Sequence, residues 1–332
     1  MKKIRYFLEY IVVRAALGMV RILPHCAVKM LARLGGWGMA LWPEAMKIAC
    51  ANIKVAFPEL KPEEVRRIAL KSFFNVAFNM TEFLWMSGRK KRIEKYTVIP
   101  EPVLSMLKNH VANNERIIFV NPHLGSWEGS GLMAPHYAGV RMVAIAKPVS
   151  NPYLNRLLNK LGREQEDGLQ IIQTKGAMRA CLKALHNGFG VGTLIDQNTR
   201  VRNGGVFVNF FGLPVPSSSA PAVLKAYCDK NSIPAVIIYG TSVRHENGVI
   251  TAHAEKLSKP FEEYKDEKEV LQELMDISQE YIRRYPEHYL WLYKRFQHIP
   301  RGCDPELRKR YPYYAKDASD NFYRKILSQL QK

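Results

Sequence analysis

A histidine and a glutamate five residues apart form the first pair in this sequence that could do chemistry. His123 and Glu128 lie in NPHLGSWEGSG, directly after the apolar run Ile117-Ile118-Phe119-Val120. On a continuous α-helix five residues turn through about 500°, so the two side chains would point apart. They can cooperate only if His123 lies on a turn after a strand and Glu128 lies in the first turn of the next helix. Such strand–loop–helix junctions are where α/β enzymes tend to keep their active sites.

The chemistry open to His123 is general-base catalysis. An imidazole with a pKa of about 6.5 can take the proton from a hydroxyl group, a role worth roughly 10²–10⁴-fold in rate. A carboxylate within reach would fix its tautomer and stabilise the imidazolium. Asp196 ends a second apolar strand and could reach the same crevice. Gly125, with the backbone N–H groups at the following helix start, could donate to a developing oxyanion.

Other chemistries have weaker support in the sequence. There is no HExxH motif and no Cys/His cluster, so we expect no metal site. Ser126 and Ser130 lack the GxSxG context of a serine nucleophile. Two plainer readings stay open: a structural histidine at 123, and a merely polar strand end at Asp196-Gln197.

The elements that must position these residues alternate between strands and helices from residue 115 onward. Apolar runs predict strands at 116–120, 141–146, 169–174, 191–196 and 234–240, with helices at 153–161, 176–186 and 219–229. Residues 249–255 are a candidate antiparallel strand, and helices are expected across 43–87 and at 267–284. The expected fold is therefore α/β, with a central, mostly parallel or mixed sheet flanked by helices.

The N-terminal 42 residues are apolar but studded with arginine and lysine. We expect two helical pieces, broken at Pro24 and ending near Gly35-Gly36, with Trp37 and Trp42 close by. Glu9 and Arg14 interrupt any signal-peptide core, and no uncharged stretch reaches the about 18 residues of a spanning helix. Basic residues and tryptophan suit the headgroup layer of a membrane. We expect residues 1–42 to be a membrane-interface segment; the alternative is a helical hairpin packed on the core.

The net charge of +19 indicates an anionic partner: an anionic membrane surface, an acidic protein or a phosphorylated substrate. No nucleic-acid-binding motif accompanies the charge, so we do not expect nucleic acid as a partner. The five cysteines are scattered and form no CxxC, which argues against disulfides or structural zinc. The predicted organisation is the segment 1–42, a catalytic domain at 43–300, and a basic, tyrosine-rich tail at 301–332.

Four segments in order carry a resemblance to a known family. They are ANIKVAFPEL, NPHLGSWE, DQNTRVRNGGVFVNFFGLPVPSSSAP and YPEHYLWLYKRF. Together they resemble the bacterial lipid A biosynthesis (lauroyl/myristoyl) acyltransferases, within the glycerolipid and lysophospholipid acyltransferase group, over about residues 45 to 298. A lone His-x4-Glu would say little, but four segments in this order are a specific match.

The resemblance implies transfer of a fatty acyl group from acyl carrier protein, or acyl-CoA, to a hydroxyl of a phosphorylated glycolipid, a lipid A precursor. It implies no cofactor, and a place at the cytoplasmic face of the bacterial inner membrane. It makes His123 the base, Glu128 its orienting partner and Asp196 a supporting group. Candidates for holding the substrates are Gly125, Lys147, Gln197, Arg200, Arg202, Lys294 and Arg295.

The sequence departs from the family pattern at several positions. Lys147 stands where an arginine is usual; it keeps the charge but loses the bidentate fork that suits phosphate. Trp127 and Phe207 to Phe211 fit core packing or an acyl-chain lining equally well. Two other functions stay open: acylation of another glycolipid or lysophospholipid, and non-catalytic membrane binding.

Overall fold

The structure is a computed structural model that describes residues 2–146, 149–163, 169–173 and 176–324. The α-helices are α1 (Lys2–Ile22), α2 (His25–Ala40), α3 (Pro43–Ala56), α4 (Pro62–Met86), α5 (Lys90–Tyr96), α6 (Glu101–Ala112), α7 (Trp127–Ala138), α8 (Pro152–Arg163), α9 (Ala177–His186), α10 (Ala220–Lys230), α11 (Glu267–Arg284), α12 (Pro305–Lys309) and α13 (Asp320–Tyr323). Short 3₁₀ helices are η1 (Val201–Asn203), η2 (Phe261–Glu263) and η3 (Pro286–His288).

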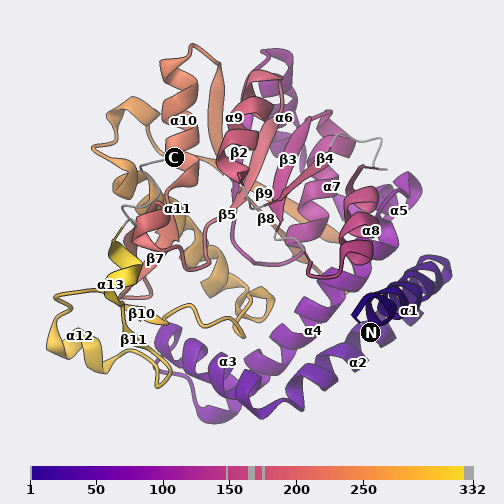
Figure 1. The fold of residues 1–332 in the computed structure, drawn as a ribbon, viewed down its shortest axis with the longest axis horizontal. Helices are drawn as coiled ribbons and strands as arrows, with labels where there is room; N and C mark the ends of the chain where they lie inside the picture. Colours follow the sequence, from indigo (N-terminus) through magenta and orange to yellow (C-terminus); the bar gives the residue numbers. More distant parts are fainter. Residues whose placement is uncertain (1, 147–148, 164–168, 174–175, 325–332) are drawn as a thin grey trace.

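A mixed, mostly parallel sheet forms the centre of the molecule (Figure 1). Its order is β1 (Thr97–Val98), β9 (Ile250–Lys256), β8 (Ala235–Arg244), β2 (Arg116–Asn121), β5 (Gly190–Leu194), β3 (Met142–Ala146) and β4 (Leu169–Gln173). The strands from β8 to β4 pair in parallel, whereas β8 and β9 pair antiparallel. A hairpin, β6 (Gly205–Phe210) with β7 (Leu213–Ser218), and a small pair, β10 (His298–Ile299) with β11 (Lys316–Asp317), lie outside this sheet.

Helices cover both faces of the sheet, as the residues of β2 show. Ile118 and Val120 belong to a core cluster with α3, α4, α9, α10 and α11, whereas Ile117 and Phe119 belong to a second cluster with α6 and α7. Successive side chains of a strand point to opposite faces, so a strand buried on both faces reads as one continuous apolar run. The expected α/β class with a mostly parallel sheet and N-terminal helices is confirmed.

Some elements differ from the sequence expectation. The antiparallel strand at 249–255 is present as β9, but α6 and the β6–β7 hairpin were not predicted. The helix expected to stop near Gly35-Gly36 continues as α2 to Ala40. The reason is close packing: a Cβ on Gly36 would overlap the ring of Phe74 on α4. These glycines bring two helices together instead of ending one.

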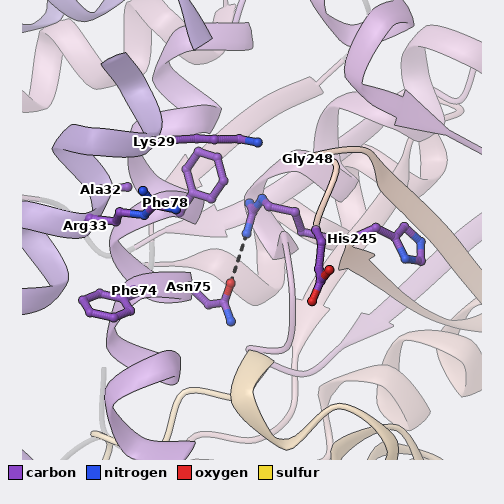
Figure 2. A pocket seen from close by; sticks show the side chains of 10 residues that line it. Lys29, Ala32, Arg33, Phe74, Asn75, Phe78, His245 and Gly248 are labelled. Carbon is purple, nitrogen blue, oxygen red and sulfur yellow. Dashed lines mark hydrogen bonds between the residues drawn. The ribbon is translucent and has the colours of Figure 1, made fainter. Parts of the chain in front are cut away.

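The helices α1 and α2 are separated at Pro24, as predicted, and lie along the outside of α4 (Figure 1). Apolar side chains stay exposed on both helices, among them Ile4, Leu8 and Val12 on α1 and Leu34 and Trp37 on α2. Within the described residues no helix combines the length and the apolar character needed to cross a membrane. Where α2 meets α4 and the turn after β8, these elements border a hollow (Figure 2).

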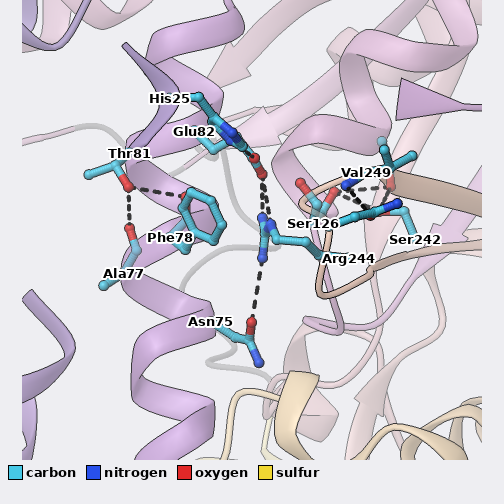
Figure 3. Close-up of polar contacts among 12 residues, drawn as sticks. His25, Asn75, Ala77, Phe78, Thr81, Glu82, Ser126, Ser242, Arg244 and Val249 are labelled. Carbon is cyan, nitrogen blue, oxygen red and sulfur yellow. Dashed lines mark hydrogen bonds and ion pairs between the residues drawn. The ribbon is translucent and has the colours of Figure 1, made fainter. Parts of the chain in front are cut away.

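A buried ion pair ties this N-terminal part to the sheet (Figure 3). Glu82 on α4 is fully buried; its Oε2 accepts from Nε of Arg244 at 3.0 Å, and its Oε1 lies 3.3 Å from Nε2 of His25. The Arg244 guanidinium also stacks on Phe78, 4.1 Å from the ring centroid. One carboxylate therefore joins α2, α4 and the end of β8.

Removal of this carboxylate should be costly. Glu82→Gln leaves the buried Arg244 without its counter-ion, a change that typically destabilises by about 3–5 kcal/mol. We expect a clearly lower denaturant midpoint of unfolding. Glu306→Gln, which breaks the exposed pair with Lys309, is the matched control and should leave the midpoint nearly unchanged. Equal midpoints for the two variants would show that the buried pair does not hold these elements together.

Candidate active site

Two neighbouring strands deliver the principal residues of the site. Within the sheet β2 lies beside β5, with Asn121 opposite Leu194. His123 follows β2 by two residues and Asp196 follows β5 by two residues. Parallel strands present their carboxyl ends at one edge, and here β5 lies between β2 and β3, so the chain order reverses at this point. Open α/β sheets form their ligand crevices at such positions.

Asp196 holds His123 through two hydrogen bonds. Its Oδ2 accepts from the backbone N–H of His123 at 2.8 Å, and its Oδ1 lies 2.7 Å from Nδ1 of the imidazole. Asp196 is 2% exposed and His123 is 8% exposed. A buried carboxylate that grips both the backbone and the ring of one residue fixes the orientation of that ring.

The second imidazole nitrogen faces a more accessible region. Nε2 of His123 lies 3.2 Å from Nε2 of the exposed Gln197, whose N–H groups can only donate. His123 therefore accepts at Nε2 and donates from Nδ1 to Asp196. This is the tautomer that a general base needs, with the lone pair of Nε2 directed toward Gln197.

The electrostatic surroundings of His123 favour its protonated form. Burial alone would lower its pKa, but the charge of Asp196, the hydrogen bond to Asp196 and the charge of Glu128 together raise it above the ordinary value. Burial would raise the pKa of Asp196, but its contacts with His123 outweigh burial and lower it. The pair therefore rests as an ionised carboxylate beside an imidazole of increased basicity.

Glu128 lies in the first turn of α7, where the spacing placed it, but it does not bind the imidazole directly. Among the described residues, the hydrogen-bonded carboxylate at Nδ1 is that of Asp196. Asp196 therefore occupies the position at the imidazole that the sequence had suggested for Glu128. Spacing along the chain could not indicate this, because it does not show that β5 lies beside β2. Burial raises the pKa of Glu128, while His123 and a hydrogen bond from Trp127 act in the opposite direction.

Gly125 has a structural role that differs from the expected one. Its N–H donates to the carbonyl of His288 at 3.0 Å, and the N–H of Ser126 donates to the carbonyl of Ser242 at 3.1 Å. Both N–H groups therefore already have acceptors. The expectation that the N–H of Gly125 donates to an oxyanion is wrong. The first N–H groups of an α-helix have no partner inside the helix, and the first turn of α7 carries amides of this kind.

Arg295 is not a surface contact for substrate, contrary to the sequence expectation. It is 1% exposed, and its guanidinium donates to Oδ1 of Asn198 at 3.0 Å, to the carbonyl of Pro216 at 2.7 Å and to Oγ of Ser217 at 2.5 Å. Burial lowers its pKa. Arg295 therefore joins the loop after Asp196 to strand β7, and its charge lies within reach of the His123–Asp196 pair.

The other basic candidates lie in different surroundings. Lys294 is partly exposed, with Nζ 3.7 Å from Oε1 of Glu44. Arg200 is exposed at the start of η1, and Arg202 donates to Asn321 near the C-terminus. Lys147 lies outside the described residues. The structure thus places Gln197 beside His123, whereas the contacts of Lys294 and Arg202 are with Glu44 and Asn321.

The segment YPEHYLW contributes residues that the sequence analysis overlooked. The N–H of Leu290 donates to the carbonyl of His123 at 3.0 Å. Tyr289 is 3% exposed; burial raises its pKa well above the ordinary value, and the charge of Asp196 and a hydrogen bond to it add to the shift. The sequence expectation here concerned Lys294 and Arg295, which follow this segment. Its backbone in fact braces the loop that carries His123.

The described residues contain no group of three or more His, Cys, Asp or Glu side chains placed to hold a metal ion. The arrangement that is present can remove a proton from a group brought to Nε2 of His123 and return it there.

The turn at Gly125 generates a prediction. Its φ is +65°, and a Cβ would overlap the carbonyl oxygen of Ser242, so Gly125→Ala combines backbone strain with a clash. We expect a loss of stability above the about 1–3 kcal/mol of left-handed strain alone, together with loss of activity. Gly139→Ala has a similar φ of +67° but meets no atom within 4 Å, so it should show the strain alone. Equal effects in urea unfolding would contradict the clash.

This chain is similar in sequence to one family of bacterial enzymes. The sequence pattern described as "Bacterial lipid A biosynthesis acyltransferase" matches residues 1–298, which include the N-terminal helices. The chain is similar to the lipid A biosynthesis palmitoleoyltransferase of Escherichia coli (strain K12) and to the lipid A biosynthesis acyltransferase of Shigella flexneri. Each is 23% identical over 281 residues, covering 81% of this chain and 84% of the relative. The chain belongs to the bacterial lipid A biosynthesis acyltransferase family.

Proposed function

We propose that this chain transfers a fatty acyl group from a thioester, with acyl carrier protein as donor and acyl-CoA as the alternative, to a hydroxyl of a lipid A precursor. The observation that carries the proposal is the buried Asp196 carboxylate on Nδ1 of His123, which leaves Nε2 to accept a proton. A neutral alcohol is a poor nucleophile, so such a base is what acyl transfer to a hydroxyl requires. Family membership supports the acyltransferase reaction class.

In the proposed mechanism the acceptor hydroxyl replaces Gln197 at Nε2 of His123. The hydroxyl oxygen attacks the thioester carbonyl carbon while its proton moves to Nε2, and Asp196 stabilises the imidazolium. The tetrahedral intermediate then expels the thiolate sulfur, which takes the proton from Nε2. The ester and the free thiol are the products, the base is regenerated, and no acyl-enzyme forms.

Glu128 acts in this proposal through its charge, and Arg295 through its hold on the loop after Asp196. Both residues alter the pKa of His123 without contacting it: the charge of Glu128 raises that pKa, and the charge of Arg295 lowers it. Arg200, Arg202, Lys147 and Lys294 remain proposed contacts for the phosphorylated acceptor or the acidic carrier. The overall charge of +19 suits an acidic donor protein through long-range attraction.

The proposal places the enzyme at the cytoplasmic face of the bacterial inner membrane, bound through residues 1–42. Exposed apolar side chains support it, including Phe7 and Met19 on α1 and Trp42 just after α2. Residues 43–300 are the proposed catalytic domain and 301–332 the proposed basic tail. Acceptor identity is tested by offering a lipid A precursor, another glycolipid and a lysophospholipid with one labelled acyl donor.

The role of His123 predicts a specific loss. His123→Ala should lower kcat by roughly 10²–10⁴-fold because the hydroxyl loses its base, while the free energy of unfolding and vesicle binding change little. His186→Ala, on the exposed side of α9, is the matched control and should retain full turnover. Thioester consumption with acceptor measures both. Near-normal turnover of His123→Ala, or an acyl-protein adduct that transfers at a competent rate, would contradict the mechanism.

The electrostatics of His123 predict the pH dependence. A base must be deprotonated to act, so activity should fall as the pH drops through the raised pKa of His123, in a limb above about 6.5. Asp196→Asn removes the charge that raises this pKa and leaves burial to lower it, so the limb should move to lower pH and kcat should fall. Glu128→Gln should shift the limb less. An unmoved limb in Asp196→Asn would show that Asp196 does not control the base.

A further inference from the structure

A hollow of about 170 Å³ lies between α2, α4 and the β8–β9 turn, apart from the His123–Asp196 pair (Figure 2). Three basic side chains line it, Lys29 and Arg33 from α2 and Arg244 from the end of β8. Phe74 and Phe78 of α4 complete one wall, and Asn75 adds an amide. Such a recess, with several cations around a small volume, has the composition of an anion site.

The contacts of Arg244 fix its guanidinium in an orientation that suits anion binding. Its Nε and Nη2 edge is bound to Glu82, and its face is stacked on Phe78. The remaining nitrogen, Nη1, lies 3.5 Å from Oδ1 of Asn75, a long contact (Figure 3). A planar guanidinium fixed on one edge and one face presents its other edge in a set direction, which suits an oxyanion of phosphate.

Lys29 and Arg33 bring further positive charge from the facing helix. They are one turn apart on α2 and so project from the same side. Lys29 reaches the β8–β9 turn because residue 248 is glycine: a Cβ there would lie 2.9 Å from Nζ. Within the described part of the chain, neither Lys29 nor Arg33 forms an ion pair with a carboxylate, whereas Arg244 pairs with Glu82.

The charges around the hollow leave room for one anion. Lys29, Arg33 and Arg244 are offset by Glu82 behind the guanidinium and by Glu246 at the rim. Among these residues, three positive and two negative charges leave one positive charge. A single phosphate diester carries one negative charge and matches this balance.

The position of the hollow indicates a lipid as the source of that phosphate. Exposed Met30, Leu34 and Trp37 on α2 and Leu41 at its C-cap form a stripe, at spacings of four, three and four residues. Lys29 and Arg33 each precede a member of the stripe and so lie about 100° around the helix, at its edge. If the stripe enters a bilayer, this edge lies at the depth of the phosphates, where basic side chains are favoured.

We propose that the hollow bordered by Lys29, Arg33 and Arg244 binds the phosphate group of a lipid headgroup. The proposal rests on the proposed membrane docking of residues 1–42. The same chemistry has two sources, a membrane phospholipid and the phosphorylated acceptor itself. The acceptor is included because the strand end that carries Arg244 also contacts the loop of His123. Ser242, two residues before Arg244, accepts from the N–H of Ser126 in that loop.

The first experiment measures saturable binding of monomeric short-chain phosphatidylglycerol to the full chain by calorimetry. We expect one site in the wild type, and at least about tenfold weaker binding in Lys29→Gln/Arg33→Gln. Glu246→Gln, which removes the opposing charge at the rim, should bind more tightly. The matched control is Lys3→Gln/Arg14→Gln, which removes two exposed positive charges from α1 outside the hollow and should bind as the wild type does.

The single variant Arg33→Gln controls for an effect of misfolding, because Arg33 is exposed and its replacement should not disturb the fold. It should weaken phosphatidylglycerol binding while the unfolding midpoint stays unchanged. Equal binding by the hollow variants and the α1 control would overturn the proposal.

A second pair of measurements identifies the source. A KM for phosphorylated acceptor that rises in Lys29→Gln/Arg33→Gln, with kcat kept, assigns the hollow to the acceptor. An unchanged KM with weaker binding to phosphatidylglycerol-containing vesicles assigns it to membrane phospholipid.

Vesicles of phosphatidylcholine alone separate this proposal from the docking on which it rests. Wild type that binds neither neutral nor anionic vesicles would refute membrane docking by residues 1–42. Wild type that binds both, with hollow variants indistinguishable from the α1 control in every assay, would refute the hollow alone.

Discussion

The structure of the site depends on one buried carboxylate. Asp196 is removed from water, and an ionised group there is tolerated only when its oxygens are bound. Both oxygens bind His123, one through the backbone and one through the ring, so the loop after β2 is held to the end of β5. The braces around that loop serve this contact: Gly125 turns the chain against Ser242, and Leu290 binds the carbonyl of His123. The base is thereby directed before any substrate arrives.

A second buried carboxylate organises the N-terminal side of the molecule. Glu82 joins α2, α4 and β8, and the same β8 reaches the His123 loop through Ser242. The helices with exposed apolar stripes are therefore coupled to the active-site loop through two hydrogen-bonded steps. This connection joins the N-terminal helices, with their exposed apolar side chains, to the loop that carries His123. It also places the orientation of Arg244 under the control of α4.

Much of this fold could be predicted from the sequence, because the signals for its strands and helices lie within short stretches of the chain. The apolar run of β2 and the glycine-rich turn after it are short-range signals, and they placed His123 and Glu128 correctly at a strand–helix junction. The partner of His123 depends on which strand lies beside β2, a long-range fact that no spacing contains. For the same reason Arg295 was expected to hold a substrate, although it is buried and donates to Asn198. Charge alone does not reveal burial.

The most direct test of the account is the protonation of His123, observed by ¹⁵N NMR of the imidazole nitrogens and assigned with His123→Gln. The account predicts an Nδ1–H tautomer at high pH, with Nε2 unprotonated, and a midpoint of titration above about 6.5 in the wild type. An Nε2–H tautomer, or a midpoint below that value, would contradict it, because Asp196 would then not be holding His123 as a base directed at the acceptor.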